Sequence, residues 1–191
     1  MTIAGVDYSW ARPDPACLYK SGFRFAVRYV SYSTTGKSMT AAEVKRLTAA
    51  GLSVVTVWQQ GAKDALGGFD LGAQYARDAE KMHRAVGGPS PAPIYFAVDF
   101  DAGEHQLPAC YAYLRGAASV LGWSRVGVYG SVRVIRYMAD KGVRSPTPTS
   151  KRFGRRTASS RTTTPRTTTS SGYRTPTLPT SKTRRTRNTP C

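Results

Sequence analysis

The 191-residue chain is long enough to form one domain with a buried core, since 40% of its residues are hydrophobic, and it leaves room for an appendage. None of its apolar runs approaches the roughly 20 residues of a membrane-spanning helix, so no membrane span is predicted. Cys17, Cys110 and Cys191 lack the spacing of metal ligands, and we expect neither a metal nor a cofactor.

Positive charge is concentrated at the C-terminal end. Residues 144–191 hold 12 of the 28 lysines and arginines and none of the 11 acidic residues, so the net charge of +17 falls to +5 for residues 1–143. This segment is rich in Thr, Ser and Pro, a composition that cannot offset the entropy cost of ordering. The sequence therefore predicts an ordered domain over 1–143 and a disordered basic tail over 144–191. Such a tail is expected to bind polyanions without specificity.

Five short runs rich in Val, Ile, Phe and Tyr, each bounded by Gly, Pro or polar residues, predict β-strands. They cover residues 2–9, 23–31, 52–59, 93–101 and 124–131. Helical patterns lie between them, over 70–86, over 106–121 and after Thr40, where Thr40 and Glu43 fit a capping box and Gly51 marks the end. This alternation predicts an α/β fold in which helices cover parallel strands.

Polar residues recur near the C-terminal end of each predicted strand. They are Asp7, Arg28, Gln59, Asp99 with Asp101, and Tyr129. Active sites of α/β barrels and open α/β sheets form at this end of the strands. A shared site is therefore expected, and the alternative is unrelated turn chemistry at each strand end.

Asp99 and Asp101 form the most informative pair. In a strand they would point to the same face, and neighbouring carboxylates raise the pKa of one of them. That arrangement suits glycoside hydrolysis, which needs one protonated acid and one carboxylate. In the structural alternative, one acid caps the following helix and the other pairs with Arg28.

Several motifs occur together in a recognisable order: GVDYSW, FRFAVRYVS, TAAEVKRLTAAGLSVVTVWQ, IYFAVDFD and SRVGVYGS. With them the chain resembles the bacterial and phage glycoside-hydrolase-like family known as domain of unknown function 1906, related to the family 25 lysozymes that cut peptidoglycan. The resemblance covers residues 3 to about 143. It implies a (β/α) TIM-type barrel with an acidic pocket at the C-terminal strand ends.

Under this hypothesis Asp101 is the general acid, Asp99 tunes it, and Asp7 stabilises positive charge at the anomeric carbon. Further side chains would bind the sugar. Those expected to orient it are Tyr8, Arg28, Gln59 and Tyr129, and those that offer stacking surfaces are Trp10 and Trp58, for which core packing is the alternative.

The chain departs from the family pattern in two ways. The related lysozymes carry Asp-x-Glu where this chain has Asp99-Phe100-Asp101. The family also continues with three more strands, usually opened by Trp-Gln-Thr, where this chain has its basic tail. We therefore expect a barrel truncated after its fifth strand. A frameshift near residue 144 would explain the change, since codons for residues 153–156 can read Trp-Gln-Thr two bases later, and sequencing the gene tests this.

Three functions stay open at this point. The first is binding or hydrolysis of cell-wall glycan (peptidoglycan), with less activity in the truncated chain than in an intact homologue. The second is a non-catalytic carbohydrate- or wall-binding module, and the third is polyanion binding through the tail alone. The N-terminal residues lack a basic, apolar leader, so we expect a cytoplasmic protein unless another route exports it.

Overall fold

The structure is a computed structural model that describes residues 3–33 and 36–143. The predicted tail over 144–191, its disorder and its polyanion binding lie outside the described residues. Strands and helices alternate along the chain, with short 3-10 turns between some of them. In order they are β1 (Gly5–Asp7), α1 (Pro15–Lys20), β2 (Phe25–Val30), α2 (Ala41–Ala49), β3 (Ser53–Trp58), α3 (Gly68–Ala85), β4 (Ile94–Val98), α4 (Leu107–Leu121), β5 (Val126–Gly130) and α5 (Val132–Asp140).

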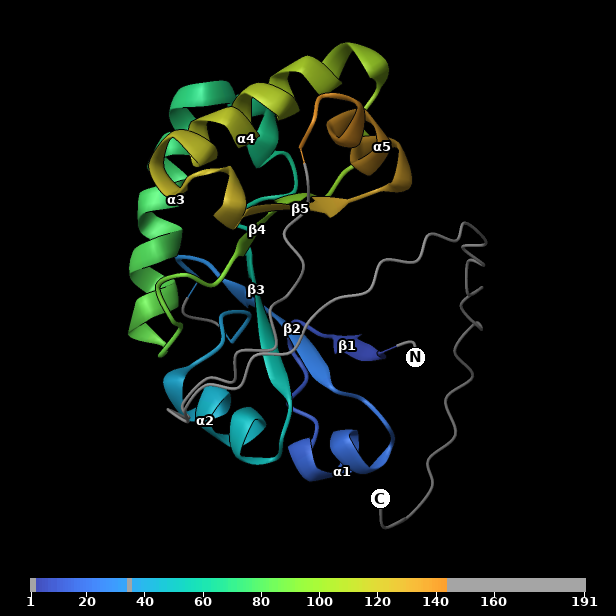
Figure 1. Cartoon of the computed structure of the whole chain (residues 1–191), viewed down its shortest axis with the longest axis vertical. Coiled ribbons are helices and arrows are strands. Elements are labelled where there is room, and N and C mark those ends of the chain that lie inside the picture. The colour runs from blue at the N-terminus through green and yellow to red at the C-terminus, as the bar shows by residue number, and fades with distance from the viewer. Residues whose placement is uncertain (1–2, 34–35, 144–191) are drawn as a thin grey trace, which may run out of the picture. The chain divides into compact units, whose positions relative to one another are not determined.

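The five strands form one parallel sheet in the order β1-β2-β3-β4-β5, so each strand pairs with the next one along the chain. Connections between such strands are right-handed as a rule, which places their helices on one face of the sheet. Figure 1 shows α1 and α2 beside the first strands, and α3 and α4 beside the last ones. The prediction of an α/β fold with parallel strands is confirmed.

The sheet is strongly curved. In a flat sheet its first and last strands would be about 19 Å apart, because neighbouring strands are separated by about 4.8 Å. Yet the Tyr129 hydroxyl of β5 donates a hydrogen bond to Asp7 at the end of β1, over 2.8 Å. This curvature is compatible with a TIM-barrel-like fold. Within the described residues β1 and β5 are the two edges of the sheet, so barrel closure stays a prediction.

The two faces of the sheet have different roles. The outer face packs against α3 and α4 through buried residues such as Trp58, Ile94 and Phe96, which form the main core. The inner face carries a smaller buried cluster of Tyr29, Val57 and Ala97. Because side chains alternate between faces along a strand, the inner face continues from this cluster to the residues at the C-terminal strand ends.

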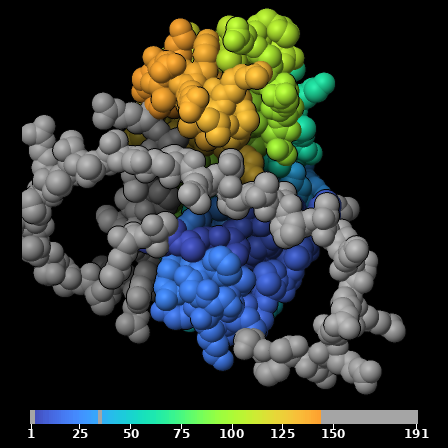
Figure 2. All heavy atoms as spheres, turned by 90° about the vertical axis from the view of Figure 1, so that its right-hand side faces the viewer, coloured from blue at the N-terminus to red at the C-terminus, as the bar shows by residue number. Residues whose placement is uncertain are grey.

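Most predicted elements are confirmed, and the differences occur at their ends. Thr40 caps α2 by accepting a hydrogen bond from the Glu43 amide, but the Glu43 carboxylate does not return the bond. The fourth strand ends at Val98, three residues earlier than expected. The helices α1 and α5 were not predicted from the sequence. Figure 2 shows α5 in orange at the surface, where Val132 is 61% exposed.

Candidate functional site

Polar side chains from all five strands gather at the C-terminal edge of the sheet in one group with two hydrogen-bonded halves. Each strand, or the residue that follows it, supplies one member, and the loop between β2 and α2 supplies another. We call this group the strand-end cluster, and its members are Asp7, Tyr29, Lys37, Gln59, Asp99 and Tyr129. Of the residues expected to share a site, the structure brings Asp7, Gln59, Asp99 and Tyr129 to this edge, and their role in a site stays a prediction.

Asp7 is the centre of one half of the cluster. The Tyr29 hydroxyl lies 2.9 Å from its Oδ1 and 3.1 Å from its Oδ2, and the Tyr129 hydroxyl donates to Oδ2 over 2.8 Å. The two rings meet edge to face with centroids 6.3 Å apart. Two phenols from strands β2 and β5 thus hold one carboxylate of β1 in a fixed orientation.

Both phenols are held in their neutral form. Burial, together with the hydrogen bonds around Asp7 and with the negative charge of that carboxylate, raises the pKa of Tyr29 far above its ordinary value. Burial and Asp7 also raise the pKa of Tyr129, although its hydrogen bond with Tyr29 acts in the opposite direction. The two side chains therefore stay hydrogen-bond donors to Asp7 at neutral and moderately alkaline pH.

This leads to a prediction about alkaline titration. A folded-state pKa above the unfolded value means that the stabilisation is complete below about pH 10 and is lost as the pH rises beyond it. At about pH 11, unfolding in urea should therefore increase the phenolate absorbance, because the unfolded chain ionises tyrosines that the folded protein keeps neutral. Tyr29→Phe should reduce that increase by one tyrosine while leaving the titration of the folded protein unchanged. A folded-state titration that loses one phenolate in the variant would contradict the assignment.

Asp99 belongs to the other half of the cluster. Lys37 Nζ donates to Gln59 Oε1 over 2.9 Å, and Gln59 Nε2 donates to Asp99 Oδ2 over 2.7 Å. These two bonds determine the orientation of the Gln59 amide. Lys37 Nζ also lies 5.3 Å from the centre of the Tyr29 ring, which brings the two halves together.

Asp101 does not stand beside Asp99 on a strand, because β4 ends at Val98 and the chain bends at Phe100. Its side chain is 91% exposed, and its nearest cation is Arg133 at 3.8 Å. Its role as general acid stays a prediction, but the expected strand geometry of the pair is wrong.

The structural alternative for the two acids is also wrong. The amide at the start of the following helical turn, that of Gly103, donates to Gln106 Oε1 rather than to Asp99 or Asp101. Arg28 pairs with Glu43, so neither acid serves it. Helix capping and an ion pair with Arg28 therefore do not explain Asp99 and Asp101.

Arg28 lies on the opposite face of the sheet from the cluster. Its side chain is fully buried and contacts both oxygens of Glu43, at 2.6 and 3.3 Å. The same guanidinium donates to the backbone carbonyls of Tyr8 and Lys37, the latter over 3.3 Å. The prediction that Arg28 orients the sugar is therefore wrong. Its side chain instead holds the backbone next to Asp7 and at Lys37 from the opposite face of the sheet.

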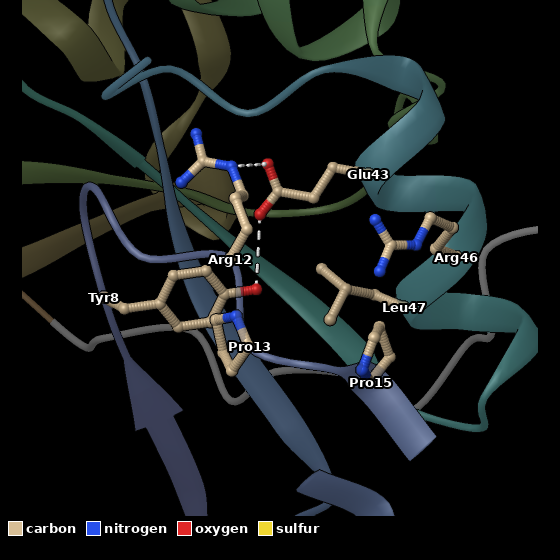
Figure 3. Close-up of a pocket in the computed structure, with 7 residues that line it drawn as sticks. All are labelled: Tyr8, Arg12, Pro13, Pro15, Glu43, Arg46 and Leu47. Atoms are coloured by element: carbon tan, nitrogen blue, oxygen red, sulfur yellow. Dashed lines mark hydrogen bonds and ion pairs between the residues drawn. The ribbon is translucent and has the colours of Figure 1, made fainter. Parts of the chain in front are cut away.

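Tyr8 belongs to the same network behind the sheet. Figure 3 shows Glu43 between Tyr8 and Arg12: the Tyr8 hydroxyl donates to Glu43 Oε1 over 3.2 Å, and Arg12 Nε lies 3.1 Å from Oε2. Burial and the nearby Glu43 carboxylate raise the pKa of Tyr8 to about 12. Its hydroxyl is therefore committed to Glu43, and the structure does not bring it to the cluster.

The two tryptophans differ. Trp58 is fully buried and packs against Tyr32 and Tyr75, with ring centroids 5.2 and 5.1 Å away, so it is a core residue and offers no stacking surface. This corrects its assignment to the sugar site. Trp10 is 64% exposed, and its role as a stacking surface stays a prediction.

Sequence reasoning missed Tyr29 and Lys37. Tyr29 is next to Arg28, and alternation along β2 sends one of them to each face. The register pairs Asp7 with Val27, so Tyr29, two residues on, shares the face of Asp7. The sequence shows that Arg28 and Tyr29 point to opposite faces, and the register, which the structure supplies, shows that Tyr29 is the one on the face of Asp7. Nothing in the sequence singled out Lys37, because the loop that carries it has no motif.

Over residues 3–33 and 36–143, no three His, Cys, Asp or Glu side chains gather closely enough to hold a metal ion. In the same part of the chain, no helix combines the length and the apolar character that a membrane crossing requires.

Comparison with known proteins connects this geometry to a family. The model of the "Rv2525c-like, glycoside hydrolase-like domain" family matches residues 16–185, a range that continues past residue 143. A curated relative, "Putative peptidoglycan hydrolase Rv2525c" of Mycobacterium tuberculosis, is 35% identical over 150 residues. The match covers 73% of this chain, and the chain spans 62% of the length of that relative.

Solved structures give the same result. Crystal structures of the Tat-secreted protein Rv2525c of M. tuberculosis, with HEPES and with L-tartrate, are 33% identical to this chain with a TM-score of 0.66. The alignments cover 72% of this chain and 73% and 72% of those chains. An uncharacterized B. stearothermophilus protein, 18% identical with a TM-score of 0.55, covers 74% of this chain and 70% of its own and shares the fold alone.

The relation to the family 25 lysozymes stays a prediction. The family model, in contrast, accounts for most of the sequence, and the resemblance stated from the motifs is confirmed. The chain belongs to the Rv2525c-like family of glycoside hydrolase-like domains.

Proposed function

We propose that the strand-end cluster binds the sugar chain of cell-wall glycan and hydrolyses it. The observation that carries this proposal is the convergence of Asp7 and Asp99 on one edge of a curved parallel sheet, each held by neutral donors. The C-terminal strand edge is where enzymes of this architecture bind substrate. A relative named as a peptidoglycan hydrolase supports the choice of glycan.

Each carboxylate has a role in this proposal. Asp7 accepts hydrogen bonds from two phenols, which suits a carboxylate that stabilises positive charge at the anomeric carbon rather than one that donates a proton. Asp101 is free of strong hydrogen bonds to the described residues and acts as the proton donor. Asp99, held by Gln59, binds a sugar hydroxyl and adds negative charge near the reacting centre.

A second candidate function is binding without hydrolysis, and the exposure of Asp101 favours it. A general acid keeps its proton near neutral pH when it is buried or lies close to another carboxylate. The side chain of Asp101 is 91% exposed and lies 3.8 Å from the Arg133 guanidinium. The two candidate functions therefore share the same glycan and differ in whether Asp101 can act as a proton donor.

The experiment compares the full chain with Asp7→Asn and Asp101→Asn for binding to insoluble peptidoglycan and for release of reducing ends. Asp7→Asn should abolish most binding and lower any hydrolysis about 100-fold, since it removes a preorganised charge. Asp101→Asn should stop hydrolysis and leave binding intact. Asp140→Asn, an exposed acid at the end of α5, is the matched control.

The outcomes separate the candidates. Binding of the wild type without release of reducing ends identifies the non-catalytic module. Binding that falls with added salt and is unaffected by Asp7→Asn indicates a polyanion contact outside the cluster and overturns the proposal.

A further inference from the structure

Lys37 is a half-buried cation at the edge of the strand-end cluster. Its ammonium group donates to Gln59 Oε1 and lies over the ring of Tyr29. An ordinary surface lysine keeps its charged head in water and its side chain in several rotamers, because holding one rotamer costs entropy. Two specific contacts that hold an ammonium group in place indicate a task for its charge.

No carboxylate of the described residues forms an ion pair with Lys37, although the cluster contains Asp7 and Asp99. Its contacts are an amide oxygen and an aromatic face, and an ammonium group has three donors. The cluster therefore presents a positive charge with remaining hydrogen-bonding capacity next to the acids Asp7 and Asp99.

The backbone that carries Lys37 is held in advance of any ligand. Arg28 donates to the Lys37 carbonyl, and Arg12 donates to the carbonyls of Gly36 and Ser38 on either side. Both arginines are themselves bound to Glu43. Two guanidinium groups thus fix the positions of three consecutive backbone carbonyls. A cation held in place in this way loses less entropy when it binds an anion.

We propose that Lys37 recognises a carboxylate carried by the bound sugar, while Asp7 and Asp99 bind uncharged groups of the same chain. This inference rests on the proposed glycan site and names its substrate class: an acidic sugar rather than a neutral N-acetylglucosamine polymer. Two acidic sugars share this chemistry, one with a lactyl ether as in peptide-free peptidoglycan and one with a uronic acid.

The test measures the affinity of the full chain for three tetrasaccharides by calorimetry. They are a neutral chitotetraose, a peptide-free peptidoglycan tetrasaccharide with lactyl carboxylates, and an alternating N-acetylglucosamine–glucuronate tetrasaccharide. We expect an acidic chain to bind about ten- to a hundredfold more tightly than the neutral one, the range of a charge-assisted hydrogen bond. The better of the two acidic chains identifies the source of the carboxylate.

Lys37→Met should remove this preference, because the affinity for the acidic chain should fall about ten- to a hundredfold more than the affinity for chitotetraose, and Lys37→Arg should keep most of the preference. Lys45→Met, which removes an exposed lysine from α2, is the control and should change neither affinity. A preference that persists in Lys37→Met overturns the inference. If the wild type binds all three chains equally and Asp7→Asn weakens each, the proposed site stands and only the role of Lys37 fails. Binding to none of them overturns both.

Discussion

Replacing Glu43 by glutamine is expected to lower the free energy of unfolding by about 3–5 kcal/mol, the usual cost of leaving a buried charge without its partner. Arg28 is fully buried and relies on Glu43 for its only ion pair among the described residues. The glutamine keeps the shape of the side chain and removes its charge. Urea unfolding should therefore show a lower midpoint with an unchanged slope.

The matched control is Arg84→Ala, which breaks the ion pair of Arg84 with Glu80. Arg84 is 57% exposed, and such a pair contributes at most about 1 kcal/mol. If Glu43→Gln changes stability as little as this control, the network behind the sheet is not a structural element. The double variant Arg28→Met/Glu43→Leu should not restore stability fully, because the carbonyls of Tyr8 and Lys37 also lose their donor.

This network connects the core to the strand-end cluster. Arg28 bonds to the carbonyl that follows Asp7 and to the carbonyl of Lys37 itself, so one buried guanidinium reaches both halves of the site through the backbone. A loss of the network should thus loosen the cluster before the whole domain unfolds. The buried ion pair and the strand-end cluster lie on opposite faces of the same edge of the sheet.

The position of the site could be predicted from the sequence because it depends on a local property. Parallel strands align their C-terminal ends, so polar residues at those ends, such as Gln59 and Tyr129, fall on one edge whatever the details of packing. Which neighbour faces the site depends on strand parity, and the choice of Arg28 instead of Tyr29 was wrong by one residue.

Other features depend on the whole fold. The contact between Asp7 and Tyr129 joins residues 122 positions apart and requires a curved sheet, which no local pattern encodes. The orientation of Asp101 depends on where β4 ends, and strand ends are set by tertiary contacts. The place of Lys37 in the cluster depends on tertiary contacts of its loop with Gln59 and Tyr29, which the sequence does not encode locally.

Both α3 and α4 were predicted from the sequence, but their close contact was not. This contact leads to the second prediction, which concerns the stability of the domain. A Cβ built on Gly116 of α4 would lie 1.9 Å from the carbonyl oxygen of Phe69, and one on Gly72 of α3 would lie 1.9 Å from that of Tyr113. Both obstacles are backbone atoms, so no side chain can turn aside. The helices cross with glycine on each side of the contact.

Gly116→Ala should therefore destabilise the domain by about 3 kcal/mol, at the upper end of the cost of overpacking. Helix propensity alone predicts the opposite sign, because alanine is favoured over glycine by about 1 kcal/mol inside a helix. The midpoint of thermal or urea unfolding distinguishes the two, and Gly72→Ala tests the same contact from the other helix. Arg115→Ala, at the neighbouring exposed position of α4, should have little effect. A more stable Gly116→Ala variant would show that the helices can separate without cost.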